Sequence, residues 1–355
     1  MVRLPNLNVL RFFLAMVVLL GHVARTSKTL GLPSLPDIPI LHKGNLAVYF
    51  FFSLSGFLII RQLYLESQKG RLNLMNFYKR RMLRILPLYY LILAAGTIIY
   101  FVILPLIGYQ TGFKNNVAEL FGYYLAFLPN VYISQHASNV GGILYVLWSI
   151  GIEIQFYLFI PLIVMAFPKH IVSALLVLLI LHAVASNQFP GIAGHYFNFY
   201  YFLVGGIISI LSLNRKLEFL RLYVLKLILM VLFILLFFTR LVYIANDILY
   251  YLITSIITAL FICSMADFPI FIIKNRLLNY LGEISYGIYM YHMICITGIL
   301  YILSRFQIDN LFNNPYLVIF SIPIIVIGLT ILIAHLSFKY VESYFIGLKY
   351  KFRKA

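Results

Sequence analysis

The sequence predicts an all-α integral membrane protein with about ten transmembrane helices and both termini in the cytoplasm. Three observations carry this prediction: the composition, the spacing of long apolar runs and the distribution of basic residues. Hydrophobic residues make up 63% and charged residues 10% of the 355 positions, whereas soluble domains average about 45–50% apolar and about 25% charged residues. The composition therefore excludes a soluble globular protein.

Ten apolar runs are long enough to cross a bilayer as helices. In chain order they cover residues 7–25, 44–62, 85–107, 143–167, 170–187, 197–213, 222–242, 247–266, 278–303 and 316–338. The first run resembles a secretory signal, but a convincing small-residue cleavage site does not follow it, so we expect it to remain as the first span. The run at 120–132 is too short to cross, and we expect it to re-enter the membrane or lie at its surface.

The basic residues predict the orientation, because Lys and Arg accumulate on the cytoplasmic side of membrane proteins. With the N-terminus inside, only six of the 27 Lys and Arg residues fall on the outer side, and 20 fall on the inner side. The outer six are Arg25, Lys28, Lys43, Lys114, Arg240 and Arg305. The net charge of +17 therefore reports topology instead of nucleic-acid binding. We expect one domain at 1–340 and a short basic cytoplasmic tail at 341–355.

Arg11 and His22 lie inside the first span, where ionisable side chains are costly and suggest function. Their separation of eleven residues corresponds to three helical turns plus about 20°, so both side chains share one face. They lie about 16 Å apart along the axis, which suits a ligand lying along the helix. The alternative is an Arg that snorkels inward and a His at the outer boundary.

Three arginines precede the third span in the inner loop FYKRRMLRILPLYY: Arg80, Arg81 and Arg84. Arg81 and Arg84 would be neighbours if this segment is helical. Guanidinium groups bind phosphate oxygens bidentately, so the cluster favours a phosphate site over a purely topological role, which lysine would serve equally well.

Glu153 is the one carboxylate that falls clearly inside a predicted span, among isoleucines and Phe156. A buried carboxylate without a partner is costly, so a functional role is favoured. Trp148, the only tryptophan, is expected at the outer membrane interface, where aromatic belts occur.

Two further segments hold candidate polar residues. The second span contains Ser55 beside Gly56, where helix packing is the favoured role. The ninth span contains Ser285, Tyr286 and His292, for which packing and function are both open. Helix rise puts His22 about 22 Å and His292 about 21 Å from the inner boundary, and Glu153 about 15 Å below the outer one. These three residues can therefore meet at a similar depth.

Five motifs in chain order resemble the membrane-bound acyltransferase-3 family, whose members O-acylate sugars and other acceptors at bacterial envelopes. They are Arg11 with His22, FSLSGFL at 52–58, RRMLRILPLY at 80–89, WSIGIEIQFYLFIPL at 148–162 and LGEISYGIYMYH at 281–292. The family often has a proline after the acid at the end of the last helix. Glu342 is followed here by Ser343, which departs from that pattern.

The resemblance implies that acyl-CoA binds from the cytoplasm, with its phosphates held by the basic residues Arg11, Arg80, Arg81 and Arg84. Its thioester would reach His22, the candidate general base, which Glu153 would orient or stabilise. Ser55, Tyr286 and His292 are candidate oxyanion donors, and Trp148 and Ser285 are candidate substrate contacts. Direct transfer and an acyl-histidine intermediate both fit the sequence.

The expected reaction is transfer of an acyl group, by family resemblance acetyl from acetyl-CoA, to a hydroxyl of an extracytoplasmic or lipid-linked glycan. The acyl-CoA acts as co-substrate, and neither a resident cofactor nor a metal site is expected; the two cysteines indicate no metal cluster. The expected location is the inner membrane of a bacterium. A transporter or flippase of a polar or lipid-linked substrate is the alternative, and a membrane glycosyltransferase or glycan polymerase is a third possibility.

Overall fold

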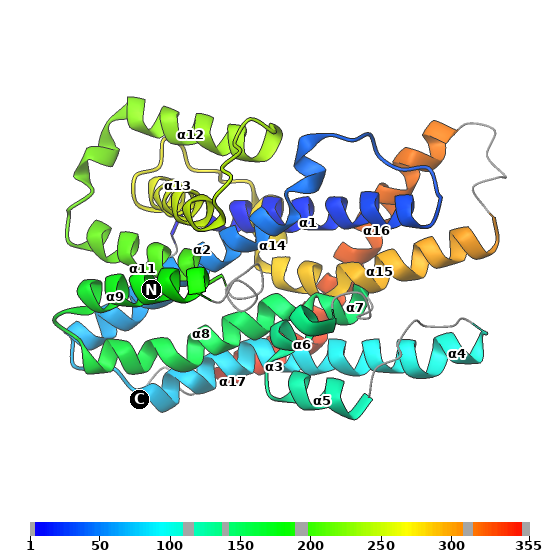
Figure 1. Ribbon diagram of the computed structural model, residues 1–355, viewed down its shortest axis with the longest axis horizontal. Helices are drawn as coiled ribbons and strands as arrows, with labels where there is room; N and C mark the ends of the chain where they lie inside the picture. Colours follow the sequence, from blue (N-terminus) through cyan, green and yellow to red (C-terminus); the bar gives the residue numbers. More distant parts are fainter. Residues whose placement is uncertain (1–3, 109–116, 137–141, 189–197, 308–314, 350–355) are drawn as a thin grey trace. The chain divides into compact units, whose positions relative to one another are not determined.

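A computed structural model describes residues 4–108, 117–136, 142–188, 198–307 and 315–349 of the chain. Every regular element in these residues is helical (Figure 1). The longer helices are α1 (Leu7–Thr29), α2 (Gly44–Gln68), α3 (Leu74–Ile98), α8 (Leu147–Ala166), α9 (Ile171–Gln188), α11 (Tyr200–Leu213), α12 (Tyr223–Phe238), α13 (Asp247–Asp267), α15 (Ser285–Arg305) and α16 (Pro315–Ser337).

Shorter helical elements complete the described chain. They are η1 (Pro39–His42), η2 (Ile99–Ile103), α4 (Leu104–Leu106), α5 (Val117–Leu125), α6 (Pro129–His136), α7 (Gly142–Tyr145), η5 (Glu218–Arg221), α14 (Arg276–Glu283), η7 (Phe338–Glu342) and α17 (Ser343–Lys349). The short run predicted at 120–132 forms α5 and α6, separated by a turn in which Phe127 adopts a φ of 59°.

Eight of the described helical stretches are long and apolar enough to cross a membrane. They match eight of the ten predicted spans. The other two predicted spans, at 197–213 and 222–242, correspond to the apolar helices α11 and α12, which have 14 and 16 residues. The all-α membrane fold is confirmed, while the count of ten and the orientation of the termini stay predictions.

Two boundaries differ from the sequence prediction. The segment with Arg80, Arg81 and Arg84 is not a loop but part of α3, which begins at Leu74; Leu, Met, Lys and Arg are good helix formers, and charge counting does not locate a helix start. The predicted ninth span is divided at Ile284 into α14 and α15. Gly282 sits there against the backbone of Asn8, where any Cβ would collide.

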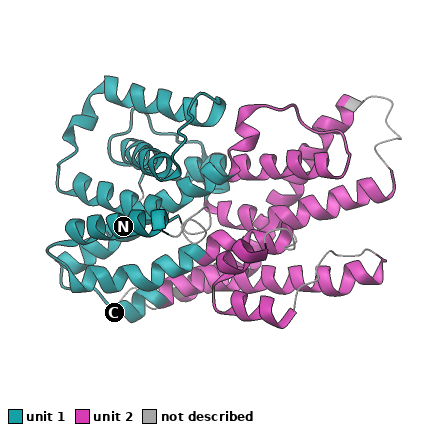
Figure 2. Cartoon of the chain, in the orientation of Figure 1, with its two compact units in different colours: residues 1–14, 45–78, 152–282 teal, residues 15–44, 79–151, 283–355 magenta. Residues whose placement is uncertain are grey.

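The chain forms two compact units, coloured separately in Figure 2. Unit 1 comprises 1–14, 45–78 and 152–282, and unit 2 comprises 15–44, 79–151 and 283–355. The division of the chain into a domain at 1–340 and a tail at 341–355 stays a prediction. The structure extends helix into this tail as far as Lys349, and residues 350–355 lie outside the described part.

Unit 1 packs α11 against α13 and α9, and α12 against α13. Glycines allow α2 and α11 to approach closely: a Cβ on Gly56 would collide with the carbonyl of Phe202, and one on Gly205 with the carbonyl of Ser53. This contact explains the small residues of the FSLSGFL segment, because small side chains let helix backbones meet.

Unit 2 packs α15 along α16 and against α7. Gly287 on α15 faces Ala334 on α16, and an added Cβ would lie 3.2 Å from the Ala334 Cβ. These contacts fix the helix that carries Tyr286, His292 and a series of residues around a cavity.

Candidate functional site

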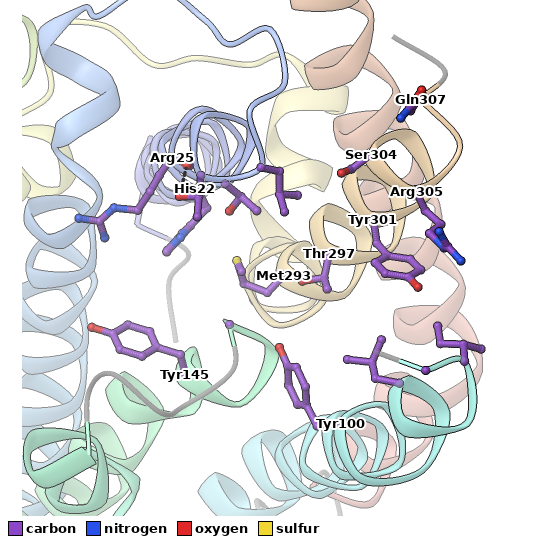
Figure 3. A pocket seen from close by; sticks show the side chains of 17 residues that line it. His22, Arg25, Tyr100, Tyr145, Met293, Thr297, Tyr301, Ser304, Arg305 and Gln307 are labelled. Carbon is purple, nitrogen blue, oxygen red and sulfur yellow. Dashed lines mark hydrogen bonds between the residues drawn. The ribbon is translucent and has the colours of Figure 1, made fainter. Parts of the chain in front are cut away.

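Unit 2 contains a cavity of about 830 Å³, a volume in the range typical of ligand sites. Its walls come from the C-terminal half of α1, from Tyr100 and the residues after it, from Tyr145 at the end of α7, and from the C-terminal half of α15 (Figure 3). His22 projects from α1 into this space, facing Met293 on α15 in the same view. The cavity therefore contains the histidine that the sequence predicts as the base.

The backbone of α1 is held close to a neighbouring segment beside His22. The preceding residue is Gly21, and a Cβ there would lie 2.6 Å from the carbonyl oxygen of Leu41 in η1. Only glycine permits this approach without displacement of backbone. The Gly21-His22 pair thus combines a packing residue with a half-buried imidazole on one helix turn.

The ring of His292 lies next to the ring of His22, with centroids 5.3 Å apart and an interplanar angle of 44°. The two residues are 270 positions apart in the sequence, and the depth comparison predicts this proximity. His292 is 1% exposed. Its Nδ1 is hydrogen-bonded to the carbonyl oxygen of Tyr289, while its Nε2 is buried and has no hydrogen-bond partner among the described residues.

The bond to Tyr289 determines what His292 can offer. A carbonyl oxygen only accepts, so Nδ1 carries the hydrogen, and Nε2 of a neutral ring then presents a lone pair. A buried acceptor without a partner is unusual in proteins and calls for an explanation. His292 therefore presents an acceptor beside His22, which is the opposite of the oxyanion donor that the sequence left open.

The start of α8 supports this pair. The hydroxyl of Tyr289 lies 2.7 Å from the hydroxyl of Ser149 and 3.4 Å from the carbonyl oxygen of Val146, to which it donates. Tyr289 thus links α15 to α8 at the level of His292, whose ring centroid is 5.5 Å from its own.

Buried tyrosines fix the opposite wall. The Tyr100 hydroxyl accepts the backbone N–H of Ile143 at 3.1 Å, and the Tyr124 hydroxyl donates to the carbonyl of Leu144 at 3.2 Å. Burial raises the pKa of the Tyr124 phenol well above its usual range, so this donor stays neutral. The two bonds hold α7, and with it Tyr145, in the cavity wall.

Glu153 lies in unit 1 with two hydroxyl partners. The Ser55 hydroxyl donates to its Oε1 at 2.6 Å, and the Tyr157 hydroxyl donates to the same oxygen. The structure thus brings together Ser55 and Glu153 of the predicted site. Tyr157 was missed by the sequence analysis, although its i, i+4 spacing from Glu153 would have indicated it. His22 belongs to unit 2, so its pairing with Glu153 stays a prediction.

The predicted donor-binding arginines fall on two helices. Arg80, Arg81 and Arg84 lie on α3 in unit 2, and the helix makes Arg81 and Arg84 neighbours, as i, i+3 residues are. Arg11 lies on α1 in unit 1, where its Nη1 donates to Oδ1 of Asn8 at 3.3 Å.

Glu342 is a buried carboxylate that the sequence analysis treated only as a departure from a motif. It is 6% exposed and interacts electrostatically with Arg84. Its Oε1 accepts the Ser337 hydroxyl at 3.3 Å, and that hydroxyl accepts the Tyr291 hydroxyl at 3.0 Å. The burial of Glu342 was not predicted because it lies in the π-helical turn η7. A π-helical turn changes which face a residue occupies and leaves no simple pattern in the sequence.

The remaining predicted residues are placed apart from the cavity lining. The Tyr286 hydroxyl donates to the carbonyl of Ile85 at 3.1 Å, and Ser285 is buried at the start of α15. Trp148 is only 3% exposed. Protein therefore covers this side chain, and its position at the outer membrane interface stays a prediction. The roles of these three residues at a substrate stay predictions.

One ion pair and two cavity arginines were not among the site residues predicted from the sequence. In unit 1, Arg61 and Asp267 form an ion pair at 2.7 Å; both lie at the inner ends of predicted spans, which would have indicated the contact. In unit 2, Arg25 and Arg305 line the cavity. Arg25 follows His22 by three residues and so lies on the same helix face.

Comparison with known proteins identifies a family that matches most of the chain and two relatives that each match part of it. The acyltransferase-3 family, described as an acyltransferase domain, matches residues 4–335. An uncharacterized protein of Haemophilus influenzae is 31% identical over 126 residues, which are 34% of this chain and 49% of that protein. Acyltransferase MdmB of Streptomyces mycarofaciens is 31% identical over 166 residues, which are 45% of this chain and 39% of MdmB.

The matched region thus spans less than half the length of either relative. Comparison with solved structures finds no match. The similarity therefore comes from sequence, and the arrangement of side chains around the cavity comes from this structure alone.

Proposed function

Because this chain belongs to the acyltransferase-3 family of acyltransferase domains, we propose that it is an O-acyltransferase of the bacterial inner membrane. It moves an acyl group, by family resemblance acetyl, from cytoplasmic acyl-CoA to a hydroxyl of an extracytoplasmic or lipid-linked glycan. Its long apolar helices make it a multi-pass membrane protein, and both relatives above come from bacteria.

The observation that carries the proposal is the His22 imidazole in a cavity beside His292. Acyl transfer to an alcohol needs a base that removes the hydroxyl proton as the oxygen attacks the thioester carbonyl carbon. In direct transfer, His22 takes this proton, the new C–O bond forms, and the C–S bond breaks. The proton then passes from the imidazolium to the departing CoA sulfur, which regenerates the base.

His292 supports this role by determining which ring nitrogen of His22 carries the hydrogen. With Nδ1–H donated to Tyr289, its Nε2 lone pair can accept an N–H from His22. The other nitrogen of His22 then carries the lone pair that a base requires. This arrangement explains why a buried nitrogen of His292 has no other partner among the described residues.

The proposed donor site uses the basic residues of α3 and α1. Arg81 and Arg84 are adjacent on α3, with Arg80 beside them, and paired guanidinium groups suit the phosphates of CoA. Arg11 shares the helix of His22, so the pantetheine arm can follow α1 from the phosphates towards the base. Glu153, held by Ser55 and Tyr157, is proposed to stabilise the imidazolium.

The test is mass spectrometry of envelope polysaccharide from cells that carry the gene, lack it, or carry His22→Ala. The proposal predicts an acetyl group per modified residue with the gene and none in the other two strains. His170→Ala is the matched control, because His170 is exposed in unit 1 and outside the cavity; it should leave acetylation intact. Full acetylation with His22→Ala, at normal protein levels, would contradict the proposal. Substrate movement without acyl-CoA turnover would instead indicate a transporter.

A further inference from the structure

The cavity around His22 carries positive charge at two places. Arg25 on α1 and Arg305 on α15 both line it and are both exposed, and in Figure 3 they stand on opposite sides of the lining. Neither forms a salt bridge with a described residue at 4.0 Å or less. The described lining residues include no acid that could neutralise them. The charge is therefore available to a ligand.

These two arginines are unexpected on topological grounds. Charge counting assigns only six of the 27 basic residues to the outer side, and two of these six line one cavity. Lys28 is also on α1 and exposed, but it does not line the cavity. A basic residue on the outer side gains nothing from the positive-inside preference, so the two arginines point to a ligand.

The rest of the lining suits a carbohydrate. Hydroxyl side chains from α1 and α15 surround the space, namely Thr26, Thr29, Thr297 and Ser304. The rings of Tyr145 and Tyr301 add flat apolar faces with a polar edge, and such amphipathic rings are common where a ligand is partly apolar and partly wet. Sugar rings have this character, with apolar C–H faces and a hydroxyl rim.

We propose that the acceptor is an acidic glycan, with its carboxylate or phosphate groups bound by Arg25 and Arg305. The inference rests on the proposed function and adds the charge class of the acceptor. Arg25 lies one helix turn beyond His22, so an anionic group on it places a neighbouring sugar hydroxyl beside the imidazole. Arg305 binds a second anionic group further along the same chain, because the two arginines stand on opposite sides of the lining. Guanidinium groups bind both kinds of anion through paired hydrogen bonds.

The experiment uses the full-length protein in proteoliposomes with radiolabelled acetyl-CoA and envelope glycan separated by anion exchange into neutral and acidic fractions. The proposal predicts that label enters the acidic fraction. Label confined to the neutral fraction would overturn it, while leaving the acyltransferase proposal intact. Failure to label either fraction would instead count against both, since the proposed function itself requires transfer.

Two chemical arms distinguish the source of the negative charge. Reduction of carboxyl groups to alcohols abolishes acceptor activity if the anion is a carboxylate. Removal of phosphate with aqueous hydrogen fluoride abolishes it if the anion is a phosphate. An acidic fraction that remains a full acceptor after both treatments overturns the proposal.

Substitutions test the arginines directly. Arg25→Gln and Arg305→Gln should each raise the KM for the acidic glycan about tenfold, the effect of one lost charge-assisted contact, while Arg25→Lys retains part of the affinity. Lys28→Gln is the matched control and should leave the KM unchanged. Unchanged KM values in both arginine variants would show that the cavity does not bind the acceptor through charge.

Discussion

Two segments of α15 use polar side chains in opposite ways: residues 285–291, here called the closed segment, and residues 292–305, the open segment. In the closed segment, the Tyr286 hydroxyl donates to the carbonyl oxygen of Ile85, and the Tyr291 hydroxyl donates to the hydroxyl of Ser337. A Cβ added to Gly287 would lie 3.2 Å from Oε1 of Glu342. In the open segment, Nε2 of His292 has no hydrogen-bond partner among the described residues, and Thr297, Tyr301 and Arg305 line the cavity. The same helix therefore holds a closed polar network and an open one.

This difference separates structure from function within one element. Buried polar groups that are fully paired stabilise a single arrangement, whereas an unpaired buried group costs free energy. A protein retains such a cost where a ligand or a reaction supplies the missing partner. Substitutions in the closed segment should therefore act mainly on stability, and substitutions in the open segment mainly on turnover.

The largest expected effect is the loss of turnover on substitution in the open segment. His292→Ala should lower the rate of acetyl transfer about 10²-fold or more, because general-base assistance contributes about 10²–10⁴ and His22 loses the group that fixes its hydrogen. Stability should fall by what the packing of one buried ring contributes, and the variant should remain folded. Initial rates and thermal unfolding of the purified variant check both expectations. A variant with normal turnover and a large loss of stability would reverse the comparison.

The next largest effect is the loss of stability when Glu342, which packs beside the closed segment, is replaced. Glu342→Ala should lower the free energy of unfolding by about 1–3 kcal/mol, because it leaves the Ser337 hydroxyl without its buried acceptor. Glu342→Gln keeps the hydrogen-bonding shape and should cost less. Thermal unfolding in detergent compares the two variants with the parent protein. Equal stability of all three would show that the network does not hold α15 in place.

A smaller effect concerns donor binding. Arg81→Ala or Arg84→Ala should raise the KM for acetyl-CoA about tenfold with little change in kcat, the pattern of a contact made equally in the ground and transition states. Lys79→Ala, on the same helix and exposed, is the control for loss of one basic residue. Steady-state kinetics across acetyl-CoA concentrations measure the change. An unaltered KM in both arginine variants would assign them to topology alone.

The smallest expected effect is that of removing the Tyr286 hydroxyl in the closed segment. Tyr286→Phe removes the hydrogen bond to the carbonyl of Ile85, so it should lower the free energy of unfolding by about 1 kcal/mol. The transfer rate should change less than about twofold, because this hydroxyl does not contact the reacting atoms. An oxyanion donor would instead lose about 10²–10³ in kcat. A loss of that size would show that Tyr286 acts in catalysis and that the closed segment is not purely structural.

The sequence predicted the features that depend on composition and on helical spacing. Long apolar runs located eight helices long enough to span a membrane, and the positions of His22 and His292 within their spans placed the two residues at a similar depth. The RRMLR segment was expected in a loop because the third span was predicted to begin at the apolar run after it, although its residues favour a helix.

Features that depend on packing were missed. Trp148 is covered by protein, which its position in an apolar run does not indicate. Glu342 is brought inward by a π-helical turn, and Arg25 gains meaning only from the cavity beside it. In each case the deciding contact joins segments distant in the chain, which spacing along one helix does not reveal.

The most direct test of the account is the rate of acetyl transfer by purified His22→Ala in proteoliposomes, compared with the parent protein at equal amounts of folded enzyme. The account predicts a loss of at least about 10²-fold, the contribution of a general base, with unchanged thermal stability. A transfer rate within a few-fold of the parent protein would show that His22 is not the base and that the cavity is not the catalytic centre.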